Sequence, residues 1–576
     1  MASTPRTTLT FLGGAGTVTG SKFLLTVGDR RVLIDSGLFQ GEKKVRQLNW
    51  EEFPVAPASI SDVVLTHAHL DHVGYLPALT KHGFSGPVWC TGSTQELAEI
   101  VLRDSAYLQE LDAAEANERG FSKHSPALPL YTIEDVEAVL PQFVSIDFDT
   151  DIPLLAEGNE VTPGEEVTVR FTRAGHILGS ASVNAWTGSA SVLFSGDLGR
   201  HDHPVLRPRD IPPGAPYVLM ESTYGDREHP EPENLPHEAF ADVIRRTIER
   251  GGTVLVPAFA IDRTEVVLQT ISALEREGRI PDVPVYVNSP MGVRALRVYQ
   301  SHPEELGQDL HPEDLVNIPD LTTVESTEDS RKLTGPGGHG PCIIISSSGM
   351  ATGGRVLHHL AALLPDPKNA VVLTGYQGVG TRGRQLSDGD EEIKIHGQYV
   401  SVRAEVVHDR EFSVHADGSD LIDWLGELDP APQQIFCVHG DQEPAEALTT
   451  RIGAELGLPA VVPSLGEVIL LDAGSDAPPA PVRRGKTAPT TPDSEKTTPR
   501  AAAPETPKPG DGSATTGLRY RLLTGPDEAA LSRRVSEALH QGYHLHDRPT
   551  LTVDGGTLIA SQAVIWPPES GDPPQD

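Results

Sequence analysis

The sequence predicts an α/β protein with two or three domains, and three observations support this prediction. The chain has 576 residues, more than one hydrophobic core usually holds. Short apolar runs typical of buried strands alternate with amphipathic segments typical of helices, the order found when helices flank a parallel sheet. After about residue 474 large apolar residues become rare, so a separate C-terminal part is expected.

The N-terminal stretch contains short apolar runs separated by turns. Residues 30–37 (RRVLIDSG) end in Asp-Ser-Gly, and residues 62–69 (DVVLTHAH) run into histidines, so each predicts a buried strand. Residues 94–111 repeat apolar side chains near helical spacing and predict a helix. Residues 189–197 (SASVLFSGD) predict another buried strand that ends in a polar turn.

The middle of the chain alternates strand and helix patterns. Four apolar runs predict buried strands: residues 253–259, 283–289, 342–349 and 370–378. Helical patterns lie between them, for example in residues 262–277 (DRTEVVLQTISALERE). This alternation favours a parallel sheet with helices on its faces, which would form a domain of its own.

The C-terminal part divides into three segments. Residues 474–516 are rich in Pro, Thr and Ala and predict a disordered linker. Residues 517–566 predict a small α+β domain with a hairpin around Asp554-Gly555, and residues 567–576 a tail. An amphipathic helix is expected before the hairpin, with apolar residues at helical spacing: Leu531, Val535 and Leu539.

Composition predicts a cytoplasmic protein without membrane segments. The N-terminus lacks the apolar core of a signal peptide, and no uncharged apolar run approaches the ~20 residues that span a bilayer. The three cysteines, Cys90, Cys342 and Cys437, are far apart in the sequence and have apolar neighbours. They therefore predict buried free thiols in a reducing compartment rather than a disulfide framework.

The hexapeptide HAHLDH, residues 67–72, is the strongest chemical signal. Histidine nitrogens and carboxylate oxygens both suit zinc. His67 and His69 are two residues apart, so an extended segment projects them the same way, and Asp71 and His72 then turn back as a second pair. One short loop can thus serve two metals. A solvated polar loop is the alternative, which four ligand-type residues in six positions disfavour.

Two further segments add residues of the same types. His176 lies in RAGHILGSAS before a predicted strand, and Asp197 lies in FSGDLGR at the end of the next one. Either residue alone is compatible with an ordinary loop. Their order after the hexapeptide makes a metal site the better interpretation.

These motifs, with a late histidine in IFCVHGD, resemble the metallo-β-lactamase superfamily, whose motifs run HxHxDH, His, Asp and a final His. The resemblance implies an αββα sandwich that binds two Zn²⁺ ions per chain. Asp35 in LIDSGLFQG matches the first family motif and would support a ligand without binding metal itself. The implied ligands are His67, His69 and His176 for one zinc, Asp71, His72 and His439 for the other, and Asp197 as a bridge.

The motifs after Asp197 resemble the β-CASP branch of this superfamily. They are, in order, ESTYGDR, PAFAIDRTEVV, VNSPM, SSSGMATGGR, GYQGVGTRG, FSVHAD and VHGD. The resemblance covers about residues 7–470. It implies that a β-CASP domain with a parallel sheet, residues 216–400, is inserted into a metallo-β-lactamase domain formed by residues 1–215 and 401–473.

The branch implies a zinc-dependent ribonuclease. Glu221 and His415 match its acidic motif and its middle histidine, and a histidine at position 439 is typical of its RNA-acting members. The likeness is greatest to short bacterial ribonucleases related to the pre-mRNA 3′-end-processing endonuclease. The expected activity is endonucleolytic cleavage of single-stranded RNA, with 5′-exonuclease activity left open.

The chemistry of phosphodiester hydrolysis is consistent with this assignment. The reaction needs a nucleophile at neutral pH, stabilisation of the phosphoryl charge, and a proton for the leaving oxygen. A hydroxide bridging two zinc ions ~3.5–4 Å apart supplies the nucleophile, and the ions stabilise the charge. His415, oriented by Glu221, would supply the proton. The predicted catalytic residues are therefore Asp71, Asp197, Glu221 and His415.

Candidates for binding substrate phosphates are Arg263, Ser413, Ser348 and Arg355. The last two lie in the Gly-rich segment SSSGMATGGR, whose backbone N–H groups could bind an anion. A surface salt bridge and a helix cap are equally good interpretations of Arg263 and Ser413. The sequence departs from the family at Asp262, where glycine is common, and at Asn288, where aspartate is common.

Three other functions stay open at this point: a DNA nuclease, a small-molecule lactam or thioester hydrolase, and a non-catalytic RNA-processing partner. The filled ligand positions disfavour the last, and the inserted domain with Glu221 and His415 disfavours the second. The net charge of −35 argues against any nucleic-acid substrate, because phosphate binding normally leaves a basic surface.

Partners beyond RNA rest on resemblance alone. The family implies a homodimer. Residues 517–566 resemble a small bacterial accessory family of unknown function and are expected to bind an unknown protein.

Overall fold

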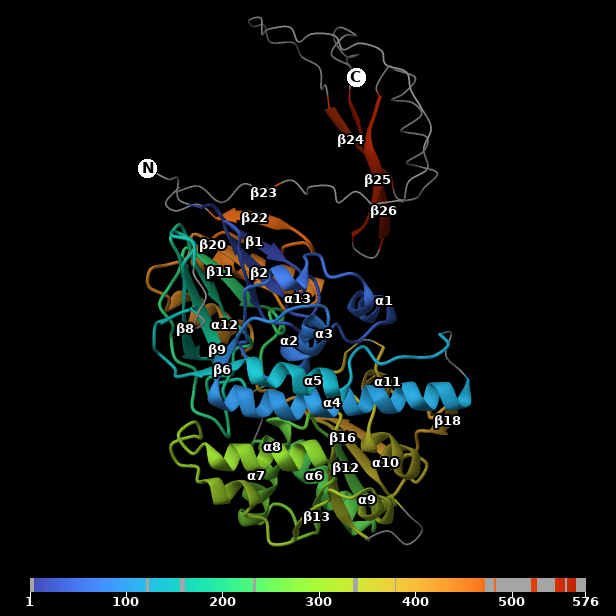
Figure 1. Ribbon diagram of the computed structural model, residues 1–576. Helices are drawn as coiled ribbons and strands as arrows, with labels where there is room; N and C mark the ends of the chain where they lie inside the picture. The colour runs from blue at the N-terminus through green and yellow to red at the C-terminus, as the bar shows by residue number, and fades with distance from the viewer. Residues whose placement is uncertain are drawn as a thin grey trace, which may run out of the picture. The chain divides into compact units, whose positions relative to one another are not determined.

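The computed structural model shows two compact units, residues 1–486 and 487–576 (Figure 1). It describes residues 5–120, 124–155, 161–230, 235–334, 340–378 and 380–471, together with strands at 481–482, 520–525, 544–554 and 557–565.

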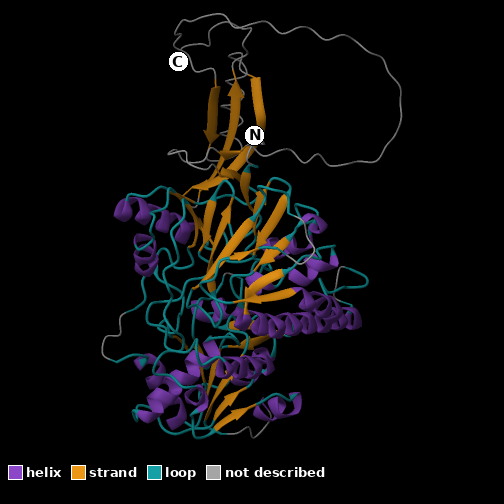
Figure 2. Cartoon of the chain, turned by 60° about the vertical axis from the view of Figure 1, so that its left-hand side comes forward, coloured by secondary structure: helices purple, strands orange, loops and turns teal. Residues whose placement is uncertain are grey.

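Two large sheets form the metallo-β-lactamase part of the first unit (Figure 2). One has the strand order β23-β22-β1-β2-β3-β4-β5-β6, with bounds β1 (Thr7–Phe11), β2 (Phe23–Val27), β3 (Arg30–Ile34), β4 (Asp62–Val64), β5 (Val88–Thr91), β6 (Phe143–Ile146), β22 (Val468–Leu471) and β23 (Pro481–Val482). The other has the order β21-β20-β11-β10-β9-β8-β7, with bounds β7 (Ile152–Pro153), β8 (Val167–Arg173), β9 (Ala181–Thr187), β10 (Ser191–Phe194), β11 (Tyr217–Glu221), β20 (Gln434–Val438) and β21 (Ala460–Val461).

The two sheets pack face to face around one hydrophobic core. Leu25 and Ile34 of the first sheet and Phe171, Val183 and Phe194 of the second belong to the same buried cluster. Strand β1 alternates buried and half-buried residues, as expected of a strand with only one face in a core. The remaining face of each sheet is free to pack against helices.

Helices cover both outer faces, which completes the predicted αββα sandwich. Residues of α3, α4 and α5 share a buried cluster with β4 and β5, and residues of α12 and α13 share another with β11 and β20. The bounds are α1 (Lys43–Gln47), α2 (Leu70–Val73), α3 (Leu76–Lys81), α4 (Gly92–Arg119), α5 (Ile133–Val139), α12 (Gly418–Gly426) and α13 (Gln442–Arg451).

The inserted part contains the predicted parallel sheet. Its strand order is β14-β13-β15-β12-β16-β19, and each neighbouring pair is parallel. The strands are β12 (Thr253–Pro257), β13 (Val285–Val287), β14 (Leu321–Thr323), β15 (Cys342–Ser346), β16 (Ala370–Leu373) and β19 (Glu405–His408). The other elements are α6 (Glu238–Glu249), α7 (Arg263–Arg276), α8 (Pro290–Ser301), α9 (Thr327–Thr334), α10 (Arg355–Leu363), α11 (Arg382–Asp388) and the hairpin β17 (Glu392–Ile395) and β18 (Gln398–Ser401).

Strand pairing places the insert slightly differently from the expected range of 216–400. Strand β11 pairs with β10 and β20 in the second large sheet, so it belongs to the sandwich. Strand β19 pairs with β16 in the parallel sheet, so it belongs to the insert. The chain then returns to the sandwich, because β20 pairs with β11 and β22 pairs with β1. The last part of the sequence therefore completes both large sheets.

The strands and helices expected in the first 400 residues are present, with ends that shift by up to eight residues. Within the described residues no helix has both the length and the apolar composition that a bilayer span requires. The three cysteines are buried free thiols, as expected.

The second unit contains one antiparallel sheet in the order β24-β26-β25, with bounds β24 (Tyr520–Gly525), β25 (His544–Asp554) and β26 (Thr557–Ile565). The pairing of Asp554 with Thr557 agrees with the predicted hairpin. The helix expected at residues 531–539 and the tail at 567–576 lie outside the described residues. Of the expected linker, 474–516, the structure describes only β23.

Candidate metal centre

The hexapeptide places its four ligand-type residues through a change from extended chain to helix. Strand β4 ends at Val64, and His69, with the extended angles φ −64° and ψ 147°, directly precedes the short helix α2. Asp71 and His72 lie within that helix. The turn into α2 therefore separates the two pairs, as the spacing predicts.

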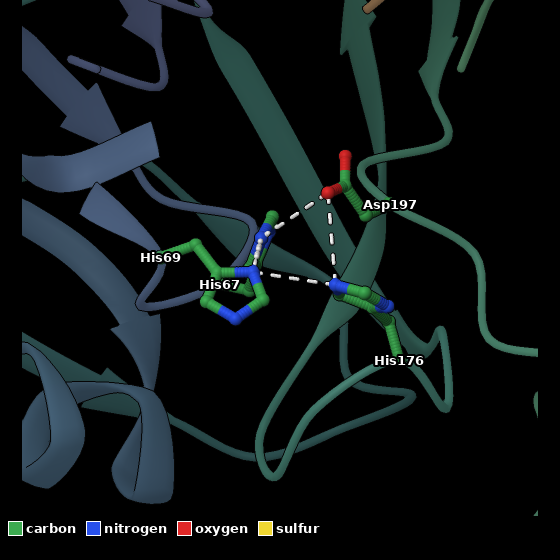
Figure 3. A group of neighbouring side chains, drawn as sticks. All are labelled: His67, His69, His176 and Asp197. Atoms are coloured by element: carbon green, nitrogen blue, oxygen red, sulfur yellow. Dashed lines mark hydrogen bonds and ion pairs between the residues drawn. The ribbon is translucent and has the colours of Figure 1, made fainter. Parts of the chain in front are cut away.

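A first group of donor atoms comes from His67, His69, His176 and Asp197 (Figure 3). Nδ1 of His69 lies 3.2 Å from Nε2 of His67 and 3.3 Å from Nε2 of His176. Oδ2 of Asp197 lies 3.5 Å from His67 Nε2 and 3.7 Å from His176 Nε2. All four donors lie within 4.8 Å of one another, which is close enough to surround one cation.

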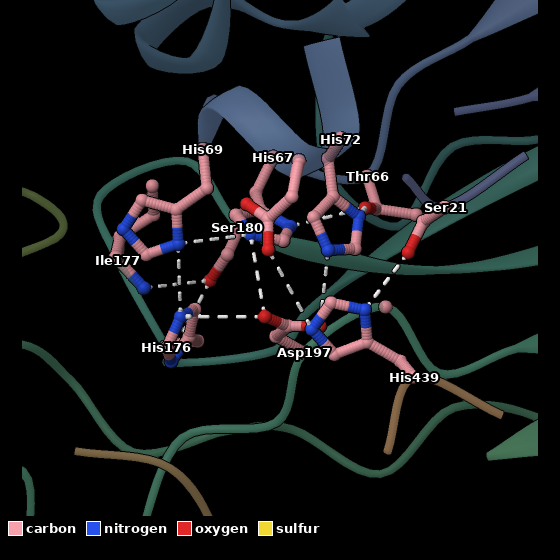
Figure 4. A network of polar contacts seen from close by, with 12 residues as sticks. Ser21, Thr66, His67, His69, His72, His176, Ile177, Ser180, Asp197 and His439 are labelled. Atoms are coloured by element: carbon pink, nitrogen blue, oxygen red, sulfur yellow. Dashed lines mark hydrogen bonds and ion pairs between the residues drawn. The ribbon is translucent and has the colours of Figure 1, made fainter. Parts of the chain in front are cut away.

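A second group comes from Asp71, His72 and His439 (Figure 4). Nε2 of His439 lies 3.9 Å from Oδ2 of Asp71. The other oxygen of Asp197, Oδ1, lies 3.3 Å from His72 Nε2 and 3.5 Å from His439 Nε2. The Asp197 carboxylate thus presents one oxygen to each donor group.

The ring nitrogens of His72 and His439 that face away from the centre are hydrogen bonded. Oδ2 of Asp35 lies 2.7 Å from Nδ1 of His72, and Oδ1 of Asp35 accepts from the backbone N–H of Thr66 at 2.8 Å. Oγ of Ser21 lies 2.8 Å from Nδ1 of His439. Such partners fix the orientation of a ligating imidazole. Asp35, named by the sequence resemblance, therefore contacts His72, whereas Ser21 and Thr66 are additions from the structure.

Burial and charge set the side chains of the first donor group in the protonation states that bind metal. Burial, reinforced by the neighbouring His72, lowers the pKa of His67 well below its usual value. Burial also lowers the pKa of His176. Burial acts to raise the pKa of Asp197, but the surrounding histidines, His439 first, hold it well below its usual value. Neutral imidazoles around an ionised carboxylate fit a divalent cation of the zinc type. In the second group, burial acts to lower the pKa of His72, but the carboxylates of Asp197 and Asp35 raise it well above its usual value.

Two buried polar atoms also fit a metal site. Nε2 of His72 and Oδ1 of Asp197 have no hydrogen-bond partner among the described residues. A buried polar atom without a partner is costly. A cation between them would provide the missing interaction, so these residues fit the metal binding that the fold implies.

Glu221 and His415 lie beside the first donor group. Glu221 ends β11, is completely buried, and accepts the backbone N–H of Leu198 at 2.6 Å. Nδ1 of His415 lies 3.5 Å from Oε1 of Glu221, and the His415 ring lies 4.3 Å from the ring of His176. Burial acts to lower the pKa of His415, but the Glu221 carboxylate offsets this and raises it. The structure brings together the acid–histidine pair expected from sequence.

Two of the four expected phosphate-binding residues have free polar atoms. Arg263 begins α7 and is only 6% exposed, yet its Nε and Nη1 have no hydrogen-bond partner in the described part of the chain. Its guanidinium lies against Gly375, where an added Cβ would be 2.6 Å from Nη1. Oγ of Ser413 is likewise buried without a partner. Both groups therefore keep hydrogen-bonding capacity that the described residues do not use.

The other two residues are engaged within the protein. Oγ of Ser348 lies 3.0 Å from Oγ1 of Thr352 and accepts its backbone N–H. Nη1 of Arg355 donates to Oδ1 of Asn288 and to the carbonyl of Val324, both at 2.9 Å. Arg355 therefore ties its helix to the neighbouring strand end.

Models of four protein families match the chain. They are the metallo-beta-lactamase superfamily at residues 16–229, the Beta-Casp domain at 264–386, the Zn-dependent metallo-hydrolase RNA specificity domain at 399–463, and a domain of unknown function (DUF1737) at 518–566. The last match agrees with the likeness seen in the C-terminal sequence.

Relatives with assigned names match over most of the chain. Ribonuclease TTHA0252 from Thermus thermophilus is 36% identical over 442 residues, covering 76% of this chain and 94% of that protein. Transcription termination factor FttA from Methanosarcina mazei is 32% identical over 468 residues, covering 78% and 69%. FttA from Methanocaldococcus jannaschii is 31% identical over 452 residues, covering 75% and 67%. The chain therefore belongs to the β-CASP branch of the metallo-β-lactamase superfamily and is a metal-dependent hydrolase.

Proposed function

We propose that this protein is a zinc-dependent ribonuclease that hydrolyses phosphodiester bonds in single-stranded RNA, as an endonuclease. The single observation that supports it best is the Asp197 carboxylate, whose two oxygens face the two donor groups. Two zinc ions, when bound there, supply a water-derived nucleophile near neutral pH and neutralise the phosphoryl charge. The name of the Thermus relative, a ribonuclease, supports RNA as the substrate.

In this proposal His415 gives a proton to the leaving oxygen. Its Nδ1 faces Oε1 of Glu221 at 3.5 Å, which leaves Nε2 for the substrate. The buried Glu221 carboxylate favours the protonated ring and fixes its plane. The His415 side chain is 19% exposed whereas Glu221 is fully buried, so substrate reaches the histidine and not the carboxylate.

Arg263 and Ser413 bind the phosphates on either side of the cleaved bond. A buried guanidinium without a partner is costly, and a phosphate offers the paired acceptor oxygens that it lacks. Ser348 and Arg355 remain secondary candidates, because their side chains are already hydrogen bonded.

The inserted domain and the Glu221–His415 pair favour a polynucleotide over a lactam or thioester, and His439 favours RNA over DNA. The charge balance, with 81 acidic and 46 basic residues, predicts weak binding of RNA outside the centre. Cleavage should therefore depend on contacts close to the broken bond.

The test compares labelled single-stranded RNA with DNA of the same sequence, using protein with measured zinc content. The variants are His69→Ala, which removes a ligand, and His415→Ala, which removes the acid. His82→Ala, an exposed histidine at the end of α3, is the matched control.

RNA cleavage by the wild type and by the control is expected. It should be abolished in His69→Ala and slowed by about 10²- to 10⁴-fold in His415→Ala. Intact RNA in a sample that holds two zinc ions would contradict the proposal. Equal cleavage of DNA would instead favour the DNA nuclease.

A further inference from the structure

The loop that carries His176 connects β8 to β9, and its residues 174–180 are buried. The backbone N–H groups of His176 and Ile177 donate to Oγ of Ser180 at 2.9 and 3.2 Å. Gly179 has φ +78°, and a Cβ there would lie 2.5 Å from the backbone nitrogen of Thr94. The loop thus has little room to change its conformation without moving His176.

The next two N–H groups of this loop are bound by residues of the inserted domain. Leu178 donates to Oη of Tyr299 at 3.2 Å, and Gly179 donates to Oε2 of Glu305 at 2.8 Å. Tyr299 lies on α8 and is fully buried, and Glu305 is 8% exposed. Residues of the inserted domain therefore bind two of the four backbone N–H groups from His176 to Gly179.

Tyr299 is itself held by Asp262. Its hydroxyl donates to Oδ1 of Asp262 at 3.0 Å. Asp262 has φ 67° and ψ −55°, and the N–H of Arg263 donates to the carbonyl of Ile261 at 2.8 Å. This is a γ-turn with positive φ, which is strained for a residue other than glycine. Its buried contact with Tyr299 gives a physical reason for an aspartate where the family commonly has glycine.

A second side chain lies beside the same carboxylate. Nε2 of His203 is 3.3 Å from Oδ1 of Asp262 but makes no hydrogen bond within the described residues. Nδ1 of His203 accepts the N–H groups of Val205 and Leu206 at 3.1 and 3.0 Å, so the ring proton of the neutral form lies on Nε2, facing the carboxylate.

Glu305 connects the loop to the sandwich as well. Its other oxygen, Oε1, accepts a hydrogen bond from Oγ of Ser93 at the start of α4. The carbonyl of Gly179 accepts from Oγ1 of Thr91 and of Thr94 at 2.8 and 2.9 Å. Helices α4 and α8 pack against each other here.

We propose that Tyr299 and Glu305 are positioning residues for His176, so that metal binding by the first donor group depends on the docked insert. Neither residue touches the centre, and both act through the backbone of residues 178–179. The measurement of RNA cleavage rests on the proposed function, whereas the measurement of zinc affinity tests the inference independently of it.

The experiment measures zinc dissociation constants by competition with a chelator, on the full chain. Tyr299→Phe removes the hydroxyl and leaves the Leu178 N–H and Asp262 Oδ1 without a partner. Glu305→Leu removes the acceptor for Gly179, whereas Glu305→Gln keeps an acceptor oxygen. Tyr131→Phe is the matched control, because Tyr131 is also fully buried and its hydroxyl lies 2.7 Å from Oγ of Ser105, in another part of the fold.

Tyr299→Phe and Glu305→Leu should each weaken one of the two zinc sites by about 10- to 100-fold, the usual effect of removing a partner of a ligand. Glu305→Gln should recover most of the affinity, and Tyr131→Phe should match the wild type. With saturating zinc, kcat on RNA should fall while KM stays unchanged. The cobalt(II) absorption spectrum of Glu305→Leu should differ from that of the wild type.

Wild-type zinc affinity in both folded variants would overturn the inference, whatever happens to RNA. If the wild type binds two zinc ions but leaves RNA intact, the proposed function fails and the affinities still decide this inference. If Tyr299→Phe does not fold, the comparison of glutamine with leucine at position 305 decides it: equal affinities overturn it, and a difference supports it.

Discussion

Nδ1 of His415 lies 3.5 Å from Oε1 of Glu221, and the carboxylate is completely buried at the end of β11. Oε1 also accepts the N–H of Leu198, whereas Oε2 has no partner among the described residues. A buried carboxylate in contact with an imidazole stabilises the protonated ring. The pair is therefore suited to hold a proton beside the metal centre without binding metal.

Replacing Glu221 by glutamine should slow RNA cleavage by about 10²-fold, because the ring of His415 loses the charge that favours its protonated form. Zinc content should stay unchanged, since Glu221 belongs to neither donor group. Single-turnover cleavage and elemental analysis measure the two quantities. Glu427→Gln, on the exposed end of α12, is the control. An unchanged rate in Glu221→Gln would remove this residue from the mechanism.

Asp35→Asn should weaken zinc binding by about 10- to 100-fold through His72. The asparagine either points its NH₂ at Nδ1 of His72 or loses the contacts of Asp35 with Thr66. A chelator competition on each variant measures the effect. Asp62→Asn is a demanding control, because Asp62 is also buried and bonded, to Arg30 and Trp89. Equal zinc affinities in the two variants would show that Asp35 supports folding only.

The sequence predicts the ligand residues well but predicts little of what holds them. His67 to His72 are recognisable because four donors occur within six positions. Ser21 is not, since it is an ordinary serine that reaches His439 across 418 positions of chain. No local sequence pattern predicts a contact between residues so far apart in the chain. The grouping of the ligands around Asp197 likewise came from family resemblance, because local spacing orders only the hexapeptide.

The same limit explains the weaker substrate-binding predictions. The Gly-rich segment around Ser348 and Arg355 suggests an anion site, but Arg355 donates to Asn288, 67 positions away. Tyr299 and Glu305 gave no signal at all, because they meet the metal loop only when the insert folds against the sandwich. Position 262 was the exception: an aspartate where glycine is common was a visible departure, and the structure gives it a hydrogen bond.

Arg263→Ala should raise KM for RNA by about 10- to 100-fold, since a charge-assisted contact to phosphate is worth ~1.5–3 kcal/mol. Zinc content should be unaffected. Arg263→Lys should recover only part of the loss, because an ammonium lacks the paired donors of a guanidinium. Arg355→Ala is the comparison. It should lower the melting temperature, because Arg355 donates to Asn288, and it should raise KM less than Arg263→Ala does. The reverse ranking of the two KM values would move the phosphate site to the Gly-rich segment.

Removing the metal should destabilise the folded protein. A ligand that binds only the native state raises its stability, so chelation should lower the melting temperature and added zinc should restore it. Scanning calorimetry with and without chelator measures this difference. In His69→Ala the chelator should have a smaller effect, because one donor group is already incomplete. An identical response in wild type and variant would argue against metal binding at the first group.

Lys22 provides a prediction about pH that is independent of catalysis. Its side chain is 3% exposed, and Nζ donates to the carbonyl of Gly20 and lies 4.0 Å from the ring centroid of Phe39. No carboxylate lies within ion-pair distance of it among the described residues. Burial lowers the pKa of Lys22 from 10.5 to about 7. The unfolded chain therefore keeps this proton over a pH range in which the folded protein releases it.

Between pH 7 and about 10 the unfolded state binds more protons at Lys22, so this residue makes the free energy of unfolding rise with pH, by at most ~1.4 kcal/mol per pH unit. Below pH 7 both states are charged, and the folded protein bears the full cost of burying the ammonium. Lys22→Met removes this dependence. Urea unfolding of both zinc-loaded proteins from pH 6.5 to 9.5 should show the wild type gaining stability relative to the variant as pH rises. Lys368→Met, at an exposed lysine, should run parallel to the wild type. Parallel curves for Lys22→Met as well would mean that the folded protein keeps the Lys22 proton, held by Gly20 and Phe39 despite burial.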